Sequence, residues 1–306
     1  MQKSLPLNSQ VPHVPVGPGN MTWLVTPGST SARFGTALGS GAHVVLLDLE
    51  DSVPADAKAD ARDAVLGFAG AHAGRAGGPL LGVRINAAHS AEGLRDIVSM
   101  ADLNLWPDLV VVPKVESGGD IAAVVRAVRR AGSAAKVWAL IESPQGVLDL
   151  PGIVRTPGLA GVLFGAADYA AAAGCQLTSR AMWYPRSQLV TAAAGAGLPA
   201  VDSPYFFLDN PDGLRRDALE AVELGFVGKV AVHPRQLNTI AQAFTPSPHE
   251  VAEARAVLAA AERADGAITT AGGAMVGPPL IEAARTIARR ARLSHNVTTS
   301  LTPKAS

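Results

Sequence analysis

Several apolar, strand-like runs in this chain end abruptly in acidic or basic residues. The clearest examples are VVLLDLED (44–51), LLGVRIN (80–86), LVVVPKVE (109–116), VWALIE (137–142) and VLFGAAD (162–168). Charged groups at strand ends are informative because a parallel α/β barrel delivers the last residues of every strand to one common mouth. Side chains far apart in the sequence assemble there into one site. The pattern therefore constrains both the fold and the place where chemistry occurs.

The apolar runs alternate with segments of helical spacing. Strands are predicted at 21–27, 43–50, 80–86, 109–115, 136–142, 159–165, 200–206 and 228–234. Most are continuously apolar, which is typical of strands buried on both faces of a parallel sheet. Ala-rich amphipathic segments at 56–72, 120–132 and 211–225 are predicted helices. The alternation predicts an α/β fold, a (β/α)8 TIM barrel; an open doubly wound sheet is the alternative, and no GxGxxG follows the first strand to support it.

The ends of the chain differ from this pattern. Residues 1–20 are rich in Pro and Gly and are predicted to form an extended N-terminal arm, with the barrel domain at 21–245. Two further helices, at 249–264 and 279–293, predict a C-terminal helical extension over 246–293, which would cap the barrel or reach a neighbouring subunit. Residues 294–306 are predicted to be a disordered tail.

Composition narrows the class of partner. Lys plus Arg and Asp plus Glu both number 26, so no global basic field favours nucleic acid or an anionic membrane surface. We expect a small-molecule substrate in a local pocket. Cys175 is the only cysteine, which excludes an internal disulfide and suits a reducing compartment. No secretory signal or membrane-spanning run is evident, and we expect a cytoplasmic protein.

Two carboxylates at neighbouring strand ends point to a metal. Glu142 ends the fifth predicted strand and Asp168 follows the sixth. Neighbouring parallel strands lie about 4.8 Å apart, so the two side chains should converge at the barrel mouth. Two carboxylates with water and substrate oxygens form a typical Mg2+ site. The alternative for each residue is a helix cap or a salt bridge.

Arg84 ends the third predicted strand, where its guanidinium can hold a carboxylate or carbonyl oxygen of a substrate with two hydrogen bonds. The alternative is an ion pair with Glu50 or Asp51, and both functions can coexist. Alternation along the strand places Asp48 and Glu50 on one face and Asp51 on the other. We expect at least one of these three acids to be structural.

Other polar residues at strand ends allow two interpretations each. Lys114 and Glu116 are either a further substrate contact and acid or an internal Lys–Glu network. His233 is a proton shuttle or, as we favour, a structural histidine before a proline turn. Cys175 has no His partner in the sequence pattern and is expected to be inert. The TPGS turn at 26–29 offers amides to a phosphate or carboxylate.

The motifs taken together resemble a known family. They are TPGSTSARFGTAL, VVLLDLEDSVPADAKADARDAV, VRIN, VVPKVES, ALIESPQGV, FGAADYAAAAG, RSQLVTAAAGAGLPAVDSPY and LGFVGKVAVHPRQL with FTPSPHEVAEAR. In this order they resemble the citrate lyase β-subunit-like branch of the HpcH/HpaI aldolase superfamily, over about residues 22 to 260. The resemblance implies a TIM barrel, a homotrimer or hexamer, Mg2+, and a lyase acting on a carboxylic acid or its acyl thioester.

The resemblance also implies roles for individual residues. Glu142 and Asp168 correspond to the metal ligands and Arg84 to the substrate-gripping arginine. Glu50 and Asp51 correspond to the acids that act with Arg84 in catalysis, and Lys114 joins Arg84 and Glu142 as an expected substrate contact. For the tail of an adenine nucleotide, Arg33, Arg180 and Arg186 are the candidates.

One position departs from the family pattern. Members acting on malyl-type thioesters often carry an Asp in a late MIDxP-like segment, offered to the neighbouring subunit's site, whereas this chain has Gly277 in AMVGPP (274–279). Gly cannot act as an acid or base. The expected function is a Mg2+-dependent carbon–carbon lyase for a 3-hydroxy acyl thioester or a hydroxy or oxo acid. The alternatives are a 4-hydroxy-2-oxo acid aldolase that uses no thioester, and a catalytically silent, carrier-protein-binding partner.

Overall fold

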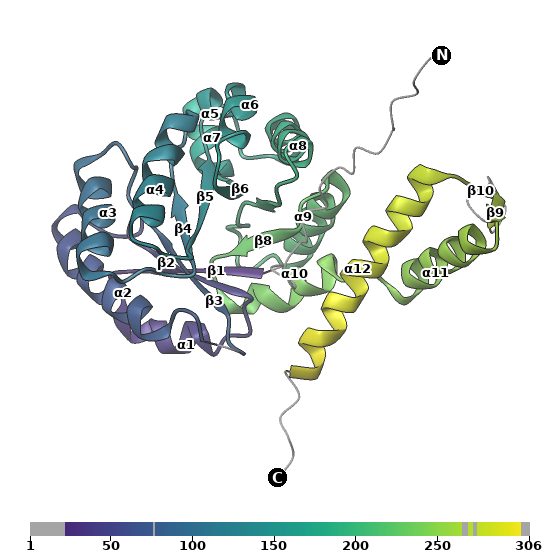
Figure 1. Ribbon diagram of the computed structural model, residues 1–306, viewed down its shortest axis with the longest axis horizontal. Helices are drawn as coiled ribbons and strands as arrows, with labels where there is room; N and C mark the ends of the chain where they lie inside the picture. Colours follow the sequence, from purple (N-terminus) through teal and green to yellow (C-terminus); the bar gives the residue numbers. More distant parts are fainter. Residues whose placement is uncertain (1–21, 76, 265–268, 272–273, 301–306) are drawn as a thin grey trace, which may run out of the picture.

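The computed structural model describes residues 22–75, 77–264, 269–271 and 274–300 of the 306-residue chain. The predicted N-terminal arm, residues 1–20, lies outside the described residues. The described chain forms a closed barrel of eight parallel strands in sequence order, with β1 paired to β8 (Figure 1). This confirms the predicted TIM barrel.

Each predicted strand segment contains one observed strand. The strands are β1 (Thr22–Pro27), β2 (Val44–Asp48), β3 (Leu80–Arg84), β4 (Leu109–Val112), β5 (Lys136–Ile141), β6 (Leu159–Phe164), β7 (Ala200–Asp202) and β8 (Gly228–Ala231). Several end before the apolar or charged run does, and β7 has only three residues. The residues beyond the strands turn away from the sheet and build the loops of the barrel mouth.

Helices follow the strands and surround the barrel. The α-helices are α1 (Phe34–Leu38), α2 (Lys58–His72), α3 (Ala91–Leu103), α4 (Gly118–Arg130), α5 (Pro144–Leu148), α6 (Leu150–Val154), α7 (Ala166–Ala173), α8 (Ser179–Gly195), α9 (Pro211–Leu224) and α10 (Leu237–Phe244). Short 3-10 turns are η1 (Ser31–Arg33), η2 (Ala55–Ala57) and η3 (Pro234–Gln236). The three helices predicted at 56–72, 120–132 and 211–225 correspond to α2, α4 and α9.

Apolar side chains fill the barrel interior. Alternate strand residues point inward, and these form one buried cluster of Trp23, Val44, Leu46, Leu109, Val111, Trp138, Leu140, Leu163, Val201 and Val230. Trp23 and Trp138 meet edge to face with ring centroids 4.9 Å apart. Gly161 makes room for this pair, because a Cβ there would lie 2.3 Å from the Trp138 ring.

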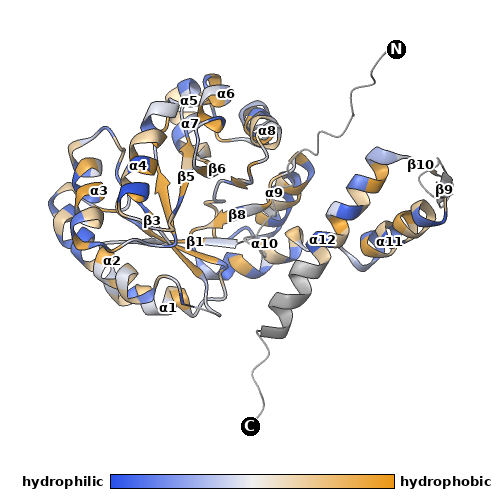
Figure 2. Cartoon of the chain, viewed as in Figure 1, coloured by the Kyte–Doolittle hydropathy of each residue, from blue (hydrophilic) through white to orange (hydrophobic). Residues whose placement is uncertain are grey.

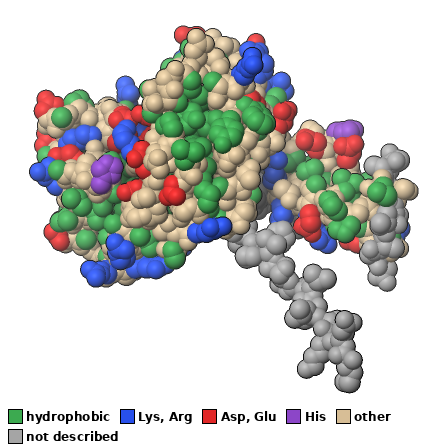
Figure 3. Space-filling view, turned by 90° about the horizontal axis from the view of Figure 1, so that it is seen from above, with side chains coloured by type: hydrophobic (Ala, Val, Ile, Leu, Met, Phe, Trp, Pro, Cys, Tyr) green, Lys and Arg blue, Asp and Glu red, His purple; other side chains and the backbone are tan. Residues whose placement is uncertain are grey.

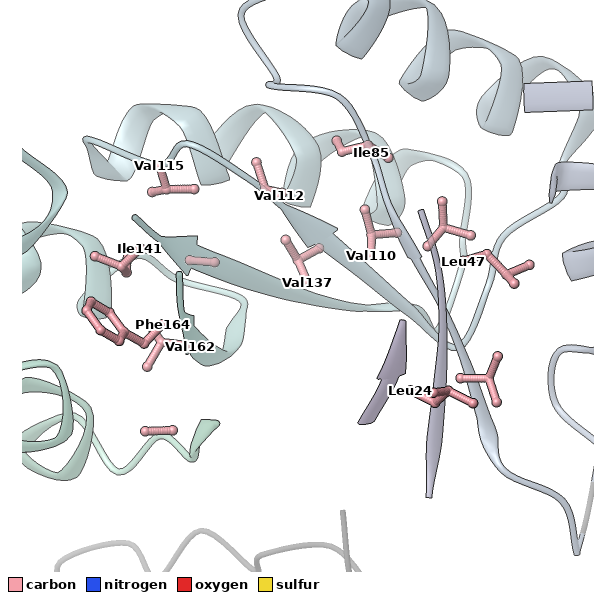
Figure 4. Packing of buried hydrophobic residues seen from close by; sticks show 14 of the residues in the cluster. Leu24, Leu47, Ile85, Val110, Val112, Val115, Val137, Ile141, Val162 and Phe164 are labelled. Atoms are coloured by element: carbon pink, nitrogen blue, oxygen red, sulfur yellow. The ribbon is translucent and has the colours of Figure 1, made fainter. Parts of the chain in front are cut away.

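The outward-pointing strand residues pack against the helices. Figure 4 shows part of this second layer, including Leu24, Leu47, Ile85, Val110, Val112, Val115, Val137, Ile141, Val162 and Phe164. Figure 2 shows hydrophobic strands at the centre and helices of mixed character around them. Since both faces of each strand are buried, the strands read as continuous apolar runs in the sequence.

A helical extension follows the barrel, as the sequence predicts. It consists of α11 (Pro248–Arg263), a hairpin of β9 (Thr269–Ala271) and β10 (Ala274–Val276), and α12 (Pro278–Ser300). Arg290 of α12 donates from Nη2 to the backbone oxygen of Phe244 at 2.8 Å, which joins the extension to α10. In Figure 1 the hairpin lies at the far end of the extension, away from the barrel.

The end of α12 corrects one boundary. The predicted tail began at residue 294, but the helix continues to Ser300, and residues 301–306 lie outside the described residues. Ser, His, Asn and Thr are weak helix formers, yet adding residues to a helix that already exists costs far less than starting one. Among the described residues, no helix combines the length and the apolar character needed to cross a bilayer.

Candidate active site

Three charged side chains reach the mouth from the inner face of the barrel. Asp48 follows the interior residue Leu46 by two positions, and Glu142 follows the interior residue Leu140 by two positions. Arg84 is paired with Asp48 in the register of β2 and β3. Because alternate residues share a face, these side chains form the layer directly above the apolar interior.

Arg84 is held by two carboxylates. Its Nε donates to Asp48 Oδ1 at 2.6 Å and its Nη2 donates to Asp48 Oδ2 at 2.8 Å. Its Nη1 lies 2.8 Å from Glu50 Oε2, in an ion pair that lacks the alignment of a hydrogen bond. The expected pairing with Glu50 is present, but Asp48 takes the place expected for Asp51. The reason is alternation: Asp48 and Glu50 share a face, and the Asp51 side chain is 54% exposed.

Asp48 also organises the loop that follows β2. Its carboxylate accepts the backbone N–H of Glu50 at 2.9 Å, the backbone N–H of Ser52 at 3.1 Å, and the Ser52 hydroxyl. Burial alone would raise the pKa of Asp48, but the hydrogen bonds and charge of Arg84, with those from Ser52 and Glu50, outweigh it and lower the pKa below its ordinary value. Asp48 is therefore an ionised structural anchor for Arg84.

The side chain of Lys58, the first residue of α2, holds the same loop by hydrogen bonds to backbone oxygens of the loop. Its Nζ donates to the oxygens of Leu49 and Glu50, both at 2.7 Å, and to Asn86 Oδ1 at 2.6 Å. Asp96 in turn accepts from the N–H and the Nδ2 of Asn86. Lys58 thus joins the loops after β2 and β3. Lys58 was not predicted from the sequence, because a lysine near a helix start looks like any surface lysine.

Lys114 brings the acids of three loops together. It has a left-handed backbone, with φ of 52°, and its N–H donates to Glu142 Oε1 at 2.8 Å. Its Nζ lies 2.7 Å from Glu50 Oε1, 3.5 Å from Asp51 Oδ2 and 3.7 Å from Asp168 Oδ1. The internal network that the sequence left open is present, and substrate contact by Lys114 stays a prediction.

Glu142 is a buried carboxyl group that packs against Gly165, where no side chain occupies the space. It is 3% exposed, and a Cβ on Gly165 would lie 2.5 Å from Glu142 Cβ and 2.7 Å from its Oε2. Burial, followed by the negative charges of Glu50 and Asp168, raises the pKa of Glu142 to about 8 against the opposing effects of the Lys114 N–H and Arg84. A cation at this carboxylate would relieve both the desolvation and the repulsion.

Glu142 and Asp168 fit a hydrated divalent cation. Asp168 lies in the first turn of α7, its side chain is 44% exposed, and its charge acts on Glu142. Within the described residues, no group of three or more His, Cys, Asp or Glu side chains is arranged to hold a metal ion. Mg2+ typically takes one or two carboxylates and completes its octahedron with water and substrate oxygens. The donor set therefore suits Mg2+ better than a structural zinc ion.

Three further predicted residues lie around this site. Glu116 accepts the Ser143 hydroxyl at 2.7 Å and is exposed. His233 accepts the backbone N–H of Arg235 at its Nδ1, 3.1 Å away, which is the structural role we favoured. Cys175 is exposed, and its inertness stays a prediction.

The TPGS turn packs against the loop of Asp48. The N–H of Gly28 donates to the backbone oxygen of Asp48 at 2.8 Å, and a Cβ at Gly28 would lie 2.5 Å from that oxygen. The N–H of Thr30 donates to Pro27. Gly28, the one residue of the TPGS turn among these two donors, is thus engaged within the fold, and the anion site suggested for this turn stays a prediction.

Comparisons with known proteins show the family of this chain. The family model HpcH/HpaI aldolase/citrate lyase matches residues 21–234. This chain belongs to that family. It is 33% identical to an L-malyl-CoA/beta-methylmalyl-CoA lyase of Rhodobacter capsulatus, over 90% of this chain and 95% of the relative. It is 34% identical to a citrate lyase subunit beta-like protein of Deinococcus radiodurans, over 86% of this chain and 94% of the relative.

A solved structure extends the similarity beyond the barrel. Protein CitE from Mycobacterium tuberculosis, in complex with magnesium, acetoacetate and coenzyme A, superposes with a TM-score of 0.76 at 30% identity. The match covers 90% of this chain and 98% of that chain. The fold of this HpcH/HpaI family member is thus shared over nearly its whole length with a magnesium-binding relative.

A second charged cluster of this family member, outside the barrel wall, was not predicted from the sequence. Arg186 of α8 donates to Asp202 from Nε and Nη2, at 3.1 and 2.9 Å. Lys229 Nζ lies 2.5 Å from both Asp202 Oδ2 and Asp217 Oδ2. Arg186 and Lys229 are buried, so the suggestion that Arg186 contacts a nucleotide tail is wrong. A lysine inside the apolar run GKVAV was the available signal, since a buried lysine requires an acid.

Proposed function

We propose that this protein is a Mg2+-dependent carbon–carbon lyase acting on a 3-hydroxy acyl thioester or a hydroxy or oxo acid. The observation that supports this most is the adjacency of two unlike groups at one mouth. The carboxyl groups of Glu142 and Asp168 interact at the mouth, where we propose that they hold the cation, and Arg84 is held in the same mouth by Asp48 and Glu50. The names of the relatives, a malyl-CoA lyase and citrate lyase beta-like proteins, point to the same reaction class.

The reaction breaks a C–C bond next to a carbonyl group. A base takes the proton of the hydroxyl group, the bond breaks, and its electron pair becomes an enolate, which is then protonated. When bound by Glu142 and Asp168, Mg2+ supplies positive charge beside the oxygens of the 2-oxo acid fragment. Preorganised charge of this kind is usually the largest catalytic term.

Arg84 is preorganised to hold a substrate oxygen. Its hydrogen bonds to Asp48 engage two of the five guanidinium N–H groups and Glu50 adds an ion pair at Nη1, which leaves N–H groups for a ligand. Glu50 is occupied by Arg84 and Lys114 and so positions both. Asp51 has an exposed side chain, whereas Glu50 is buried. We propose that Asp51 takes the proton from the hydroxyl group of the substrate.

Gly277 bears on the substrate class. Position 277 has room for a side chain, since the nearest atom to an added Cβ is Pro279 Cδ at 4.0 Å, and its backbone is not left-handed. The local fold would therefore accept an acidic side chain at position 277 and does not itself require glycine there. This favours simple cleavage or condensation over thioester hydrolysis, and keeps the 4-hydroxy-2-oxo acid aldolase as the second candidate.

We also propose a homo-oligomer, a trimer or hexamer. Figure 3 shows hydrophobic side chains gathered on the upper face of the molecule. Leu148 of α5 and Trp183 and Tyr184 of α8 are among the exposed large apolar residues. Exposed apolar surface of this extent is typical of a face that contacts another protein. Light scattering of the full chain measures the assembly directly.

Calorimetric titration tests the proposed function. Mg2+-loaded protein is titrated with pyruvate, oxaloacetate, glyoxylate and acetyl-CoA, and the series is repeated without metal. Metal-dependent binding of an oxo acid supports the lyase site, and binding of acetyl-CoA selects the thioester branch. Glu142→Ala and Asp168→Ala should each abolish Mg2+ binding while the melting curve stays cooperative. Unchanged Mg2+ affinity in either variant would refute the ligand assignment.

A further inference from the structure

Lys114 has an unusual backbone for a lysine. Among the described residues, Asn104 and Lys114 are the non-glycine residues with positive φ. Asn104 is the C-cap of α3, where a left-handed Asn is common. Lys114 lies in the loop after β4, and its Cβ makes this conformation unfavourable. Strained residues of this kind cluster at functional sites.

The left-handed backbone of Lys114 directs its N–H and its side chain to acids of different loops. The N–H of Lys114 donates to Glu142 at 2.8 Å, while its side chain extends to the acids of other loops. Nζ is 2.7 Å from Glu50 and 3.7 Å from Asp168. Its side chain is 41% exposed, so the ammonium can move without unfolding the loop.

Charge balance shows why an ammonium is needed there. Asp48 engages two nitrogens of Arg84, and Glu50 is close to the third. In the described part of the site, Lys114 is the cation that faces the remaining acids, Asp51 and Asp168. Its ammonium lies 3.7 Å from Asp168 Oδ1 and its N–H donates to Glu142, so Lys114 contacts both of the proposed metal ligands.

We infer that Lys114 is a built-in counter-cation that competes with Mg2+ for Asp168 and passes to the substrate when the metal binds. The inference rests on the proposed function, because it takes Asp168 and Glu142 as the metal ligands. Metal binding is then an exchange: the contact between Nζ and Asp168 is lost as Mg2+ arrives. The released ammonium, still anchored through its backbone N–H, faces a negatively charged substrate oxygen. Lys114 thereby lowers metal affinity and raises substrate affinity.

Two variants without the ammonium test this exchange. Lys114→Gly suits the left-handed backbone and keeps the N–H that binds Glu142, and Lys114→Met keeps the length of the side chain. We expect both to bind Mg2+ roughly tenfold more tightly by calorimetry, because a repelling charge near the ion has been removed. We expect both Mg2+-loaded variants to bind pyruvate or oxaloacetate roughly tenfold more weakly.

A matched control is Lys136→Met, since Lys136 is an exposed lysine at the opposite end of β5. It should change neither affinity. Equal or weaker Mg2+ binding in both Lys114 variants, with wild-type melting curves, would overturn the inference and leave the proposed function standing. Mg2+ binding by the variants but not by the wild type would support it strongly. Absence of Mg2+ binding in all proteins would refute both the inference and the metal site.

Discussion

Asp48 and Glu142 are both buried carboxyl groups of the same mouth, yet their surroundings move their pKa values in opposite directions. Burial raises both values, but Arg84 and Ser52 reverse the effect at Asp48, whereas Glu50 and Asp168 add to it at Glu142. Asp48 therefore stays ionised and holds Arg84. Glu142 stays largely protonated at neutral pH until a cation replaces the proton.

Asp48→Asn should lower the free energy of unfolding by about 3 kcal/mol, because it leaves Arg84 with only part of its counter-charge in a buried position. Urea unfolding at neutral pH measures this. The control, Asp51→Asn, changes an exposed carboxylate and should stay within about 0.5 kcal/mol of the wild type. Since folding lowers the pKa of Asp48, its stabilisation is present above the ordinary value of 3.8 and is lost as the pH falls below it. Equal stability of the two variants would contradict the anchoring role.

Mg2+ affinity should rise about tenfold per unit between about pH 6 and pH 8 and level off above, because Glu142 must lose its proton to bind. Its pKa of about 8 lies above the ordinary 4.5, so the metal-free chain loses stability as the pH rises through this interval. Calorimetry across the pH range checks both the slope and the proton release. Glu142→Gln should bind weakly at every pH. A flat wild-type profile would show that Glu142 is not a ligand.

Large and small residues on different strands complement one another in the barrel interior. Trp138 of β5 fills the space left by Gly161 of β6 and packs on Trp23 of β1, so three strands depend on one small residue. A glycine in a strand usually marks such a close approach. The loops repeat this arrangement, where Gly165 makes room for Glu142.

Gly161→Ala should therefore lower the free energy of unfolding by about 1–3 kcal/mol, since the added methyl group meets an aromatic ring that cannot move aside. Gly67→Ala is the opposite control. Gly67 lies in the middle of α2 with nothing within 4 Å of an added Cβ, so alanine should stabilise by about 0.5–1 kcal/mol. Thermal or urea unfolding compares the two. Equal effects of the two substitutions would show that the contact with the Trp138 ring does not decide the outcome at Gly161.

At the scale of the whole molecule, the C-terminal extension projects from the barrel, and the proposed homo-oligomer would bring it to a second copy. The hairpin before Gly277 lies away from the chain's own barrel in Figure 1. Gly277 accepts the N–H of Ile281 at 3.1 Å and is thus the N-cap of α12. A side chain at this position would reach a mouth only through assembly.

Gly277→Asp should fold and assemble as the wild type does. Its free energy of unfolding should change by only about 0.3 kcal/mol, because Asp is a good N-cap. We expect the variant, and not the wild type, to release free thiol from an acyl-CoA thioester. Gly277→Asn is the matched control, since it caps equally well but carries no acid. An inactive but correctly assembled Asp variant would show that this chain lacks more than the acid.

Much of the site was predictable from single residues. Asp48, Glu50, Arg84, Lys114 and Glu142 were all identified as charged ends of apolar runs, because a parallel barrel brings every strand end to one mouth. The pairing of Arg84 with Asp48 was not predictable. It depends on how far β2 continues before it turns, which is a matter of a single residue.

Local sequence determined the eight strands, their buried faces and the charged layer at their ends, because burial on both faces and two-residue alternation are properties of each strand alone. The tertiary structure decided what depends on several elements at once. Lys58 acquired its role from oxygen atoms of two loops, Arg186 is buried against Asp202, and Lys114 contacts acids from three loops. Coulomb and desolvation energies depend on distances in space, and the order of residues along the chain does not contain them.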